Sequence, residues 1–490
     1  MSNNQPGRHG ILRGLDTAAQ SSTFEGRFGR MFRTLPKATW TEEALKKLAA
    51  AMSADPEPNP TPETETDDEE NTGISAGYTY LGQFIDHDIT FDPNSSLQKD
   101  NDVNSLVDFR TPRLDLDNVY GRGPDDQPYM YDDTGMKFLL GRPLTGSDLA
   151  HNVKDLQRIT SEPKRAIIGD PRNDENVIVS QLQGVFLRFH NYLVEVMPGS
   201  SFSEVQREVR FHYQWAVLHD FLPTIIGQGM VDNILSTGLK FYKPRKEAYM
   251  PVEFSVAAYR FGHSMVRPIY RLNQTIPRFA IFSDNPANSL TGFREFPSNW
   301  SIDWRLYFNF DSNPNPHSPQ RIQPAYKIDT SLVNPLANLP ASIGGTMPSL
   351  PLRNLLRGLR MGLPSGQDVA CKMGVPPIAD KDLKVGKATE GDTPKNKSIV
   401  DIDPSFKGKA PLWYYILAEA QQQFKKNNTP IRLGEVGGRI VGEVLIGLLL
   451  HDSHSYLSQA PCWQPRPELL IKGKFGIAGL IGGAGRSKFS

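Results

Sequence analysis

The segment Ser180–Met197, SQLQGVFLRFHNYLVEVM, indicates the fold class of this 490-residue chain. Its apolar residues recur at the i, i+3, i+4, i+7 spacing of one helix face, and Pro198-Gly199 follows directly. These apolar residues are Leu182, Val185, Phe186, Phe189, Leu193 and Val196. A second segment of helical period runs from Ser203 to Leu218. Both patterns predict helices that pack against a core.

The chain beyond residue 75 has mainly helical periodicity, with no internal repeat and no alternation typical of strands. Two long segments rich in Pro, Asn and Gly, Asp311–Ala325 and Asn334–Leu352, show no period and predict ordered loops. We therefore expect residues 75–490 to form one large, mainly α domain with long ordered loops.

The first 74 residues differ from the rest in composition. Residues 1–53 end in a predicted amphipathic helix that begins after Thr41, and we expect them to form a peripheral arm. Residues 54–71 read ADPEPNPTPETETDDEEN, and such a proline-rich acidic sequence cannot bury apolar surface. Residues 54–74 are therefore predicted to be an extended, mobile linker.

Composition excludes several classes of protein. The chain has 54 Lys+Arg and 54 Asp+Glu, so no basic excess favours nucleic acid or an anionic membrane. Its two cysteines, Cys371 and Cys462, show no CxxC or CxxCH spacing, which excludes a disulfide scaffold, a thiolate zinc site and thioether-linked haem. The longest apolar run, Ile440–Leu450, is too short to span a bilayer. No signal peptide is recognisable, so we expect a cytoplasmic protein or one exported without a cleavable leader.

The segment Tyr80–Phe91, YLGQFIDHDITF, carries an unusual group of polar residues. On a helix, Gln83, Asp86 and His87 lean toward one surface, whereas Asp88 lies about 100° further round and points elsewhere. Carboxylates beside a histidine in an apolar helix are costly unless something satisfies them. For His87 alone, a hydrogen-bonded core histidine is the plain alternative.

The segment 111–121, TPRLDLDNVYG, alternates oxygen donors at Thr111, Asp115 and Asp117. This spacing lets a loop wrap around a hard cation, and Asp88 could supply a further carboxylate. A DxD pattern without other support is usually a turn, so both interpretations stay open.

Four motifs occur in a distinctive order along the chain. They are GQFIDHD at 82–88, TPRLDLDNVYG at 111–121, RNDE at 172–175 and YRFGH at 259–263. Together they resemble the animal haem peroxidase family, of the myeloperoxidase and lactoperoxidase kind, over roughly Ser75–Leu457. The resemblance implies a haem b cofactor and hydrogen peroxide as substrate. Because the chain has few cysteines and no leader, we expect a bacterial member.

The resemblance also implies catalytic roles. His87 matches the distal histidine, which takes a proton from hydrogen peroxide and returns it to the leaving oxygen. Arg172 matches the distal arginine that stabilises developing negative charge, and Gln83 matches the glutamine that holds water or halide. A surface ion pair of Arg172 with Asp170 or Asp174 is the alternative.

Other residues match the haem-binding positions of the family. His263 matches the proximal iron ligand, and Arg260 the arginine that pairs with a haem propionate. Asn354 matches the asparagine that accepts the proximal imidazole N–H, with an ordinary helix asparagine as the alternative. Asp86 and Glu175 match the carboxylates that form ester bonds to the haem.

The calcium site of the family carries over onto Asp88 and the loop at 111–121. Its ligands are then Asp88, Thr111, Arg113 through its backbone carbonyl, Asp115 and Asp117. The implied ion is structural, because it ties the loop to the residue next to His87.

The resemblance implies a peroxidase that oxidises halides, thiocyanate and phenolic or aromatic donors through a ferryl intermediate. The methionine that forms a sulfonium link in myeloperoxidase is replaced by Asn176, so bromide and iodide are expected rather than chloride. A non-catalytic haem- or calcium-binding adhesion module is one alternative, but it predicts loss of His87 or Arg172, and neither is lost.

A fatty-acid dioxygenase of the cyclooxygenase-like branch is the other alternative. Those enzymes place a radical-forming tyrosine three residues before the proximal histidine, where this chain has Arg260. Tyr259 is one position off. We expect a helix with Val252, Val256 and Tyr259 on the same stripe as His263, and Tyr259 to point away from the position that a radical-forming tyrosine needs.

Overall fold

Helix α5 (Val177–Val196) is the predicted helix around Ser180–Met197, and it is buried along most of its length. Asn176 begins it, because its side-chain oxygen accepts hydrogen bonds from the N–H groups of Ile178 and Val179 at 3.0 and 2.9 Å. The helix ends at Val196, just before Pro198. This computed structural model describes residues 26–56, 67–92, 94–147, 153–244, 247–283, 285–310 and 321–487.

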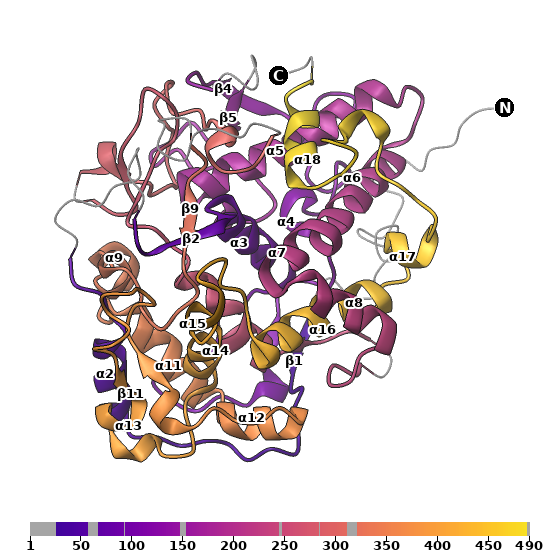
Figure 1. The fold of residues 1–490 in the computed structure, drawn as a ribbon. Helices are drawn as coiled ribbons and strands as arrows, with labels where there is room; N and C mark the ends of the chain where they lie inside the picture. Colours follow the sequence, from indigo (N-terminus) through magenta and orange to yellow (C-terminus); the bar gives the residue numbers. More distant parts are fainter. Residues whose placement is uncertain are drawn as a thin grey trace.

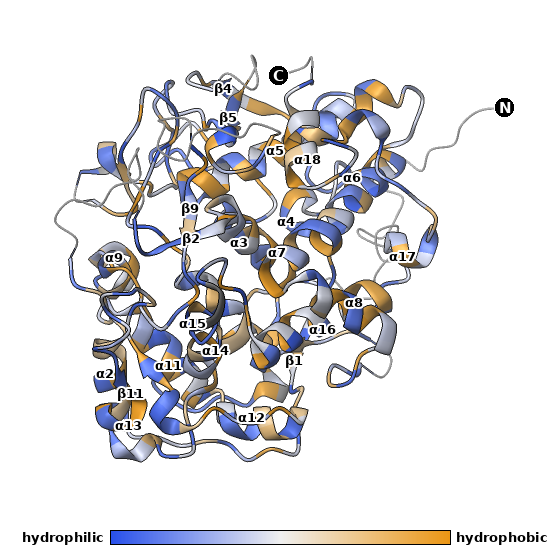
Figure 2. Ribbon diagram, in the orientation of Figure 1, coloured by the Kyte–Doolittle hydropathy of each residue, from blue (hydrophilic) through white to orange (hydrophobic). Residues whose placement is uncertain are grey.

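Three helices pack directly on α5: α3 (Gly77–Ile89), α6 (Phe202–Ala216) and α18 (Ile477–Ala484). Helix α6 corresponds to the second predicted helix and continues through a π-helical turn, Val217–Phe221, into α7 (Leu222–Ile226) and α8 (Gln228–Thr237). Hydrophobic and hydrophilic residues interleave along α6 in Figure 2, as expected for a helix with one buried side.

A second group of helices forms the lower part of the molecule in Figure 1. Its members are α2 (Glu42–Ala51), α11 (Leu350–Arg360), α12 (Gly366–Met373), α13 (Ile399–Ile402), α14 (Leu412–Gln421) and α16 (Glu435–His451). Helix α14 contacts α11, α12 and α16, and α16 also contacts α7 and α8 of the first group. Buried apolar residues of both groups form one continuous core.

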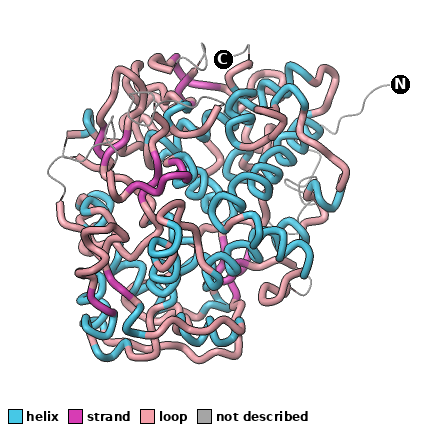
Figure 3. Tube along the Cα trace, viewed as in Figure 1, coloured by secondary structure: helices cyan, strands magenta, loops and turns pink. Residues whose placement is uncertain are grey.

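The remaining elements are short. The other α-helices are α4 (Asp117–Tyr120), α9 (Asn334–Ala337), α10 (Ala341–Gly344), α15 (Phe424–Asn427) and α17 (Tyr456–Gln459). Single 3-10 turns lie at Val103–Ser105, Pro128–Met130, Pro171–Asp174, Pro286–Asn288, Trp304–Leu306, Asp380–Asp382, Pro404–Phe406 and Pro467–Leu469. The structure is thus mainly helical with long connections, as predicted (Figure 3).

Short strands add small sheets that the sequence pattern did not reveal. Strand β1 (Gly26–Gly29) pairs antiparallel with β3 (Val107–Asp108) and parallel with β6 (Met250–Pro251). The antiparallel pairs are β2 (Glu70–Ser75) with β9 (Pro324–Tyr326), β4 (Leu140–Pro143) with β5 (Lys154–Leu156), β7 (Ile269–Tyr270) with β8 (Phe279–Ala280), and β10 (Lys384–Val385) with β11 (Lys397–Ser398). Strands this short show too few alternations to be recognised in a sequence.

The N-terminal region is not peripheral where the structure describes it. Helix α2 begins after Thr41, as predicted, but it packs against α11 and α13, and its residues Leu45 and Leu48 are fully buried. Its apolar stripe therefore completes the core. Residues 1–25 lie outside the described residues.

The predicted linker is wrong at its C-terminal end. Glu70–Ser75 form β2, and the buried carboxylate of Glu70 pairs with Arg267 at 2.9 Å and Arg321 at 2.8 Å. An acidic residue can enter a core when such cations satisfy it. Residues 57–66 of the predicted linker are outside the described part of the chain.

The predicted loops are also partly helical. Asn334–Leu352 contains α9, α10 and the start of α11, each with a proline at its N-terminus, where proline is well tolerated. Helices α9 and α10, with four residues each, are too short to show a period. Of Asp311–Ala325, residues 311–320 are not described. No helix in the described ranges is both long and apolar enough to cross a membrane.

Candidate active site

A cavity of about 880 Å³ lies between α3 and the segment that ends at His263. We call α3 together with residues 172–176 the His87 wall, and residues 253–263 together with α11 the His263 wall. Apolar residues close the rest of the cavity: Leu97, Ile281, Phe282, Phe293, Leu336, Leu339, Ile343 and Leu350. This volume is in the range of small-molecule and cofactor sites.

Helix α3 directs its polar residues as the sequence predicted. Gln83, Asp86 and His87 line the cavity, whereas Asp88 lies on the other side of the helix, fully buried. The Asp86 carboxylate accepts a hydrogen bond from Thr90 Oγ1 at 3.0 Å. Burial raises the pKa of Asp86, although the charges of Arg172 and Arg260 oppose this.

His87 is held in one orientation by an asparagine. Its Nδ1 lies 2.7 Å from Asn173 Oδ1, and Asn173 Nδ2 donates to Gln183 Oε1 at 2.8 Å. Because Asn173 uses its amide N–H toward Gln183, its oxygen faces His87, whose Nδ1 then carries the proton. Burial and the charge of Arg172 lower the pKa of His87 to about 3. The imidazole is therefore neutral near pH 7, with the lone pair on Nε2.

Glu175 completes the His87 wall. Its Oε1 lies 3.7 Å from His87 Nε2 and accepts a hydrogen bond from Gln83 Nε2. Asn176 donates to Gln83 Oε1 at 3.2 Å, so Gln83 is held at both ends of its amide. Burial raises the pKa of Glu175 to about 7, with the charge of Arg172 opposing it.

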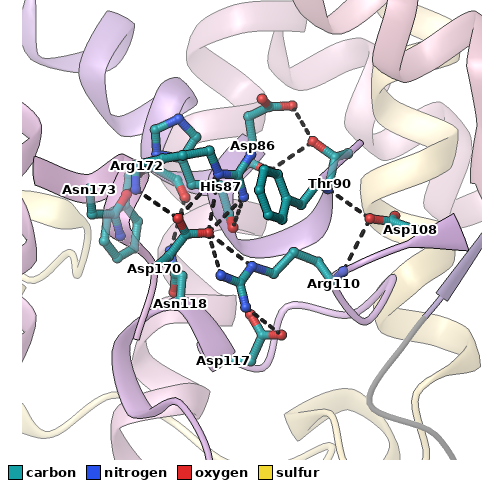
Figure 4. Close-up of polar contacts among 12 residues, drawn as sticks. Asp86, His87, Thr90, Asp108, Arg110, Asp117, Asn118, Asp170, Arg172 and Asn173 are labelled. Atoms are coloured by element: carbon teal, nitrogen blue, oxygen red, sulfur yellow. Dashed lines mark hydrogen bonds and ion pairs between the residues drawn. The ribbon is translucent and has the colours of Figure 1, made fainter. Parts of the chain in front are cut away.

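Arg172 is close to His87 but is not among the residues that line the cavity. Its guanidinium donates to the backbone carbonyl of His87 at 2.9 Å and pairs with Asp170 at 2.7 Å (Figure 4). The guanidinium also lies over the ring of Phe91, 4.4 Å from its centroid. The ion pair with Asp170, weighed above as the alternative, is present, but it is not a surface pair, because Asp170 is fully buried.

Asp170 connects Arg172 to a second arginine. Arg110 donates to Asp170 Oδ2 through Nε at 2.9 Å and through Nη2 at 2.5 Å, and its Nη1 lies 3.5 Å from Asp117 (Figure 4). Although burial opposes it, the charges of Arg172 and Arg110 lower the pKa of Asp170 below its ordinary value. A continuous chain of charged groups thus runs from Asp117 to the backbone of His87.

The segment that carries His263 is helical, as predicted, but it is not an α-helix. Glu253–Ala257 form a π-helix and Ala258–His263 a 3-10 helix. Burial and the charge of Arg260 lower the pKa of His263 to about 3, so this imidazole is also neutral. His263 lines the cavity.

Asn354 of α11 meets His263 as predicted, but with the opposite hydrogen-bond polarity. Asn354 Nδ2 lies 2.8 Å from His263 Nδ1, so Asn354 donates rather than accepts. The reason is Arg260, whose Nη1 donates to Asn354 Oδ1 at 3.0 Å and so occupies the amide oxygen. Binding of a metal at His263 Nε2 therefore requires the Asn354 amide to turn over.

The His263 wall is positively charged. Besides Arg260, it presents Arg353 and Arg357 to the cavity. Arg357 pairs with Asp92 at 3.3 Å, and Arg353 donates to the backbone carbonyl of Ile343. The two α11 arginines escaped the sequence reasoning, although their i, i+4 spacing within LRNLLRGL could have revealed them.

Tyr259 does not point away from the cavity. It lines the cavity, its hydroxyl is buried, and no described residue gives that hydroxyl a hydrogen bond. Its ring stacks on Phe254, with centroids 4.6 Å apart. Tyr259 and His263 thus line the same cavity, as expected for residues on one stripe of the segment.

A cluster of carboxylates lies behind α3. Asp88, Asp115 and Asp117 bring oxygens within 4.8 Å of one another, and both carboxylate oxygens of Asp88 lack a hydrogen bond from any described residue. Thr111 Oγ1 donates to Asp115 at 2.6 Å. Burial and mutual repulsion raise the pKa values of Asp88 and Asp117. A divalent cation would satisfy this cluster, since hard cations take carboxylate oxygens.

Two further contacts of the site escaped the sequence reasoning. Asn173 orients His87, and Asn176 fixes Gln83. Both residues lie in or beside the RNDE motif, so its short polar run was the available signal. Arg113 pairs through its side chain with Asp452 at 3.4 Å.

Comparison with known proteins agrees with this site. The model of the animal haem peroxidase family matches residues 98–291. Over these residues the chain is similar to the animal haem peroxidase family. It is 24% identical to the probable oxidoreductase PXDNL of Homo sapiens over 188 residues, which are 35% of this chain and 13% of that protein. It is also 24% identical to thyroid peroxidase of Canis lupus familiaris over 296 residues, or 55% of this chain and 30% of that protein.

The chain therefore spans less than a third of the length of these curated relatives. Among solved structures, peroxidase A of Dictyostelium discoideum is similar with a TM-score of 0.54 at 16% identity, covering 93% of each chain. Fatty acid α-dioxygenase of Oryza sativa is similar with a TM-score of 0.52 at 14% identity, covering 92% of this chain and 78% of that one. Both similarities show that the chain shares the fold of these structures.

Members of the family typically bind haem, and the residues present fit that group. His263 offers an imidazole ligand within the cavity, and the arginines of the His263 wall match the negative charge of haem propionates. The apolar lining suits a tetrapyrrole ring. On the other wall, the unpaired lone pair of His87 lies in the same cavity.

Proposed function

We propose that this protein is a haem peroxidase that uses hydrogen peroxide to oxidise small donors. The observation that carries the proposal is the placement of two neutral histidines in one cavity, with carboxyl groups beside His87 and arginines beside His263. In this proposal His263 is the iron ligand and Arg260, Arg353 and Arg357 hold the propionates. When bound, the haem supplies the redox chemistry.

His87 is the proposed acid–base group. Its neutral Nε2 accepts a proton from hydrogen peroxide in the cavity and then donates that proton to the departing oxygen. Asn173 keeps Nδ1 protonated, so that Nε2 is the atom that exchanges protons. Gln83, held by Glu175 and Asn176, presents its amide to the same space and positions water or a halide.

Arg172 supports this role from behind His87 rather than from within the cavity. Its positive charge lowers the pKa of His87, which keeps the imidazole ready to accept a proton. The same charge favours negative charge that develops in the cavity as peroxide loses its proton. Asp170 and Phe91 keep the guanidinium in place.

Asp86 and Glu175 are the proposed sites of ester bonds to the haem, since both carboxyl groups reach the cavity. Extraction with acidified acetone after peroxide treatment tests this point. Haem should stay on the wild-type protein and be released from the double variant Asp86→Val, Glu175→Gln. Release from the wild-type protein would show that no ester forms.

Calcium is the proposed occupant of the cluster of Asp88, Thr111, Asp115 and Asp117, with the backbone carbonyl of Arg113 as a further ligand. The unpaired, fully buried Asp88 carboxylate supports it. Arg110 then links the ion to Asp170 and so to His87.

The donor is proposed to be bromide, iodide, thiocyanate or a small phenol. The apolar lining favours aromatic donors, and Asn176 stands where chloride-oxidising myeloperoxidase has methionine. Haem-loaded protein should consume peroxide with at least one of these donors in a fixed ratio to product. Haem-free protein is the control, and peroxide consumption without product for every donor would refute the proposal.

Tyr259 favours a second candidate function, a fatty-acid dioxygenase. Tyr259 lines the cavity, its buried hydroxyl has no hydrogen-bond partner among the described residues, and the solved α-dioxygenases share the fold. Oxygen uptake with palmitic acid that is lost in Tyr259→Phe would establish this function. Peroxidase turnover that is unchanged in Tyr259→Phe, without oxygen uptake, would exclude it.

A further inference from the structure

Arg188, in the middle of α5, is a buried cation to which no described residue gives a counter-charge. Its side chain is on the side of α5 away from solvent, and the residue is 3% exposed. Nε donates to the backbone carbonyl of Gly184 at 3.4 Å, which is beyond the usual length of a hydrogen bond. No described residue forms a hydrogen bond or an ion pair with its two Nη atoms.

Several other buried arginines have carboxylate neighbours among the described residues. Arg267 and Arg321 share Glu70, and Arg210 lies within the field of Asp452 and Asp115. For Arg188, burial lowers the pKa to about 10, and no charge on a described residue opposes this. The side chain is still protonated at neutral pH, so the described residues leave a net positive charge at this point.

A small cavity, separate from the site described above, lies against Arg188. It has a volume of about 20 Å³, between α5, α18 and the segments around Ser147 and Trp304. Val153, Phe310 and Ile481 make most of its remaining wall apolar. Such a volume holds one water-sized species and is too small for a carboxylate ligand or a phosphate.

We propose that this cavity binds one small monovalent inorganic anion, of the size of chloride or bromide, as the counter-ion of Arg188. A buried charge is costly unless it is paired, and a water molecule of the same size would leave the guanidinium uncompensated. The anion is structural: it lies where α18 packs against α5, so its binding stabilises the docking of the C-terminal helix. This site does not depend on the proposed peroxidase activity.

Thermal unfolding of the haem-loaded protein tests the site, with sodium chloride exchanged for sodium gluconate at constant sodium concentration. Gluconate is too large for the cavity. Chloride should raise the unfolding temperature to a plateau, and at 100 times its Kd the folded-to-unfolded ratio should be about 100-fold higher. The variant Arg188→Met, which removes the charge and keeps the length, should show no chloride dependence.

Two further measurements make the test independent of how well that variant folds. Arg207→Met, at an exposed position of α6, should respond to chloride like the wild type. Wild-type crystals grown in bromide should show an anomalous peak beside the Arg188 guanidinium. Equal unfolding temperatures in chloride and gluconate, or crystals without that peak, would overturn the proposal.

Asp148 is a rival source of the negative charge, because it follows Ser147 in the sequence and lies outside the described residues. If Asp148 were the counter-ion, the wild type would ignore chloride and Asp148→Asn would acquire the response. If the anion is the counter-ion, Asp148→Asn should keep the wild-type chloride dependence.

Discussion

The two walls of the cavity each hold a neutral histidine, but different groups face the cavity beside those histidines. The His87 wall places two carboxyl groups, Asp86 and Glu175, beside the imidazole, whereas the His263 wall places arginines there. Burial lowers both histidine pKa values to about 3. The difference shows that burial alone does not assign a role to a histidine. The neighbouring groups distinguish a histidine that exchanges protons from a histidine that lies beside a bound anion.

Removing the proposed iron ligand of the His263 wall should have the largest effect on the difference between the two walls. His263→Ala should abolish stable haem binding, because the arginines alone provide no axial bond to iron. Haem titration followed by absorption measures this. The same substitution at exposed His451 is the control. A Soret band in His263→Ala equal to that of the wild type would contradict the assignment of this wall.

Asp170→Asn should cause the largest loss of stability on the His87 side, about 3–5 kcal/mol at pH 7, since Arg172 loses its carboxylate partner and Arg110 keeps only Asp117, at 3.5 Å. The pKa of Asp170 is lowered in the folded state, so its stabilisation is present above the unfolded value near pH 4 and is lost as the pH falls below it. Urea unfolding at several pH values should therefore show the wild type and variant converging only in acid. A difference that persists unchanged at the lowest pH would contradict the ion-pair account.

Removing the proposed proton acceptor of the His87 wall should leave haem binding intact and slow the reaction with hydrogen peroxide. His87→Ala should react with hydrogen peroxide at least ~100-fold more slowly, the usual cost of a lost acid–base group. Stopped-flow absorption measures the rate. Asn173→Ala sharpens the comparison: it should slow the same step less, because the imidazole stays but loses its fixed tautomer. A near-normal rate in His87→Ala would exclude the proposed role.

The smallest expected effect concerns the carboxylate cluster behind the His87 wall. With calcium at 100 times its Kd, the wild type should gain about 2.7 kcal/mol of stability, which Asp88→Asn should lose. In the presence of a chelator, Asp88→Asn should be more stable than the wild type, because the variant removes one of three carboxylates that repel one another. Asp133→Asn, at an exposed position, is the control. Equal stability of the wild type with calcium and with chelator would contradict a cation site.

The sequence predicted the positions of backbone elements better than the directions of side chains. Helical period was enough to place Gln83, Asp86 and His87 on one face and Asp88 on another, because that geometry is local. It could not place Arg172, whose direction depends on Asp170 and on Phe91 packed beneath it.

Contacts between distant segments limited the prediction in the same way. The amide of Asn354 is turned by Arg260, which is 94 residues away in the chain. The segment that carries His263 is a π-helix followed by a 3-10 helix, a detail that no periodic pattern of so few residues reveals. The core position of α2 depends on α11 and α13, some 300 or more residues later.

The spin state of the ferric haem-loaded protein tests the difference between the two walls most directly. The spin state is measured by electron paramagnetic resonance and by absorption, before and after the addition of one equivalent of hydrogen peroxide. The account predicts a five-coordinate, high-spin iron with His263 as its only protein ligand, and a spectrum that changes at once with peroxide and returns when a donor is added. A six-coordinate, low-spin iron bound by both His87 and His263 would contradict it.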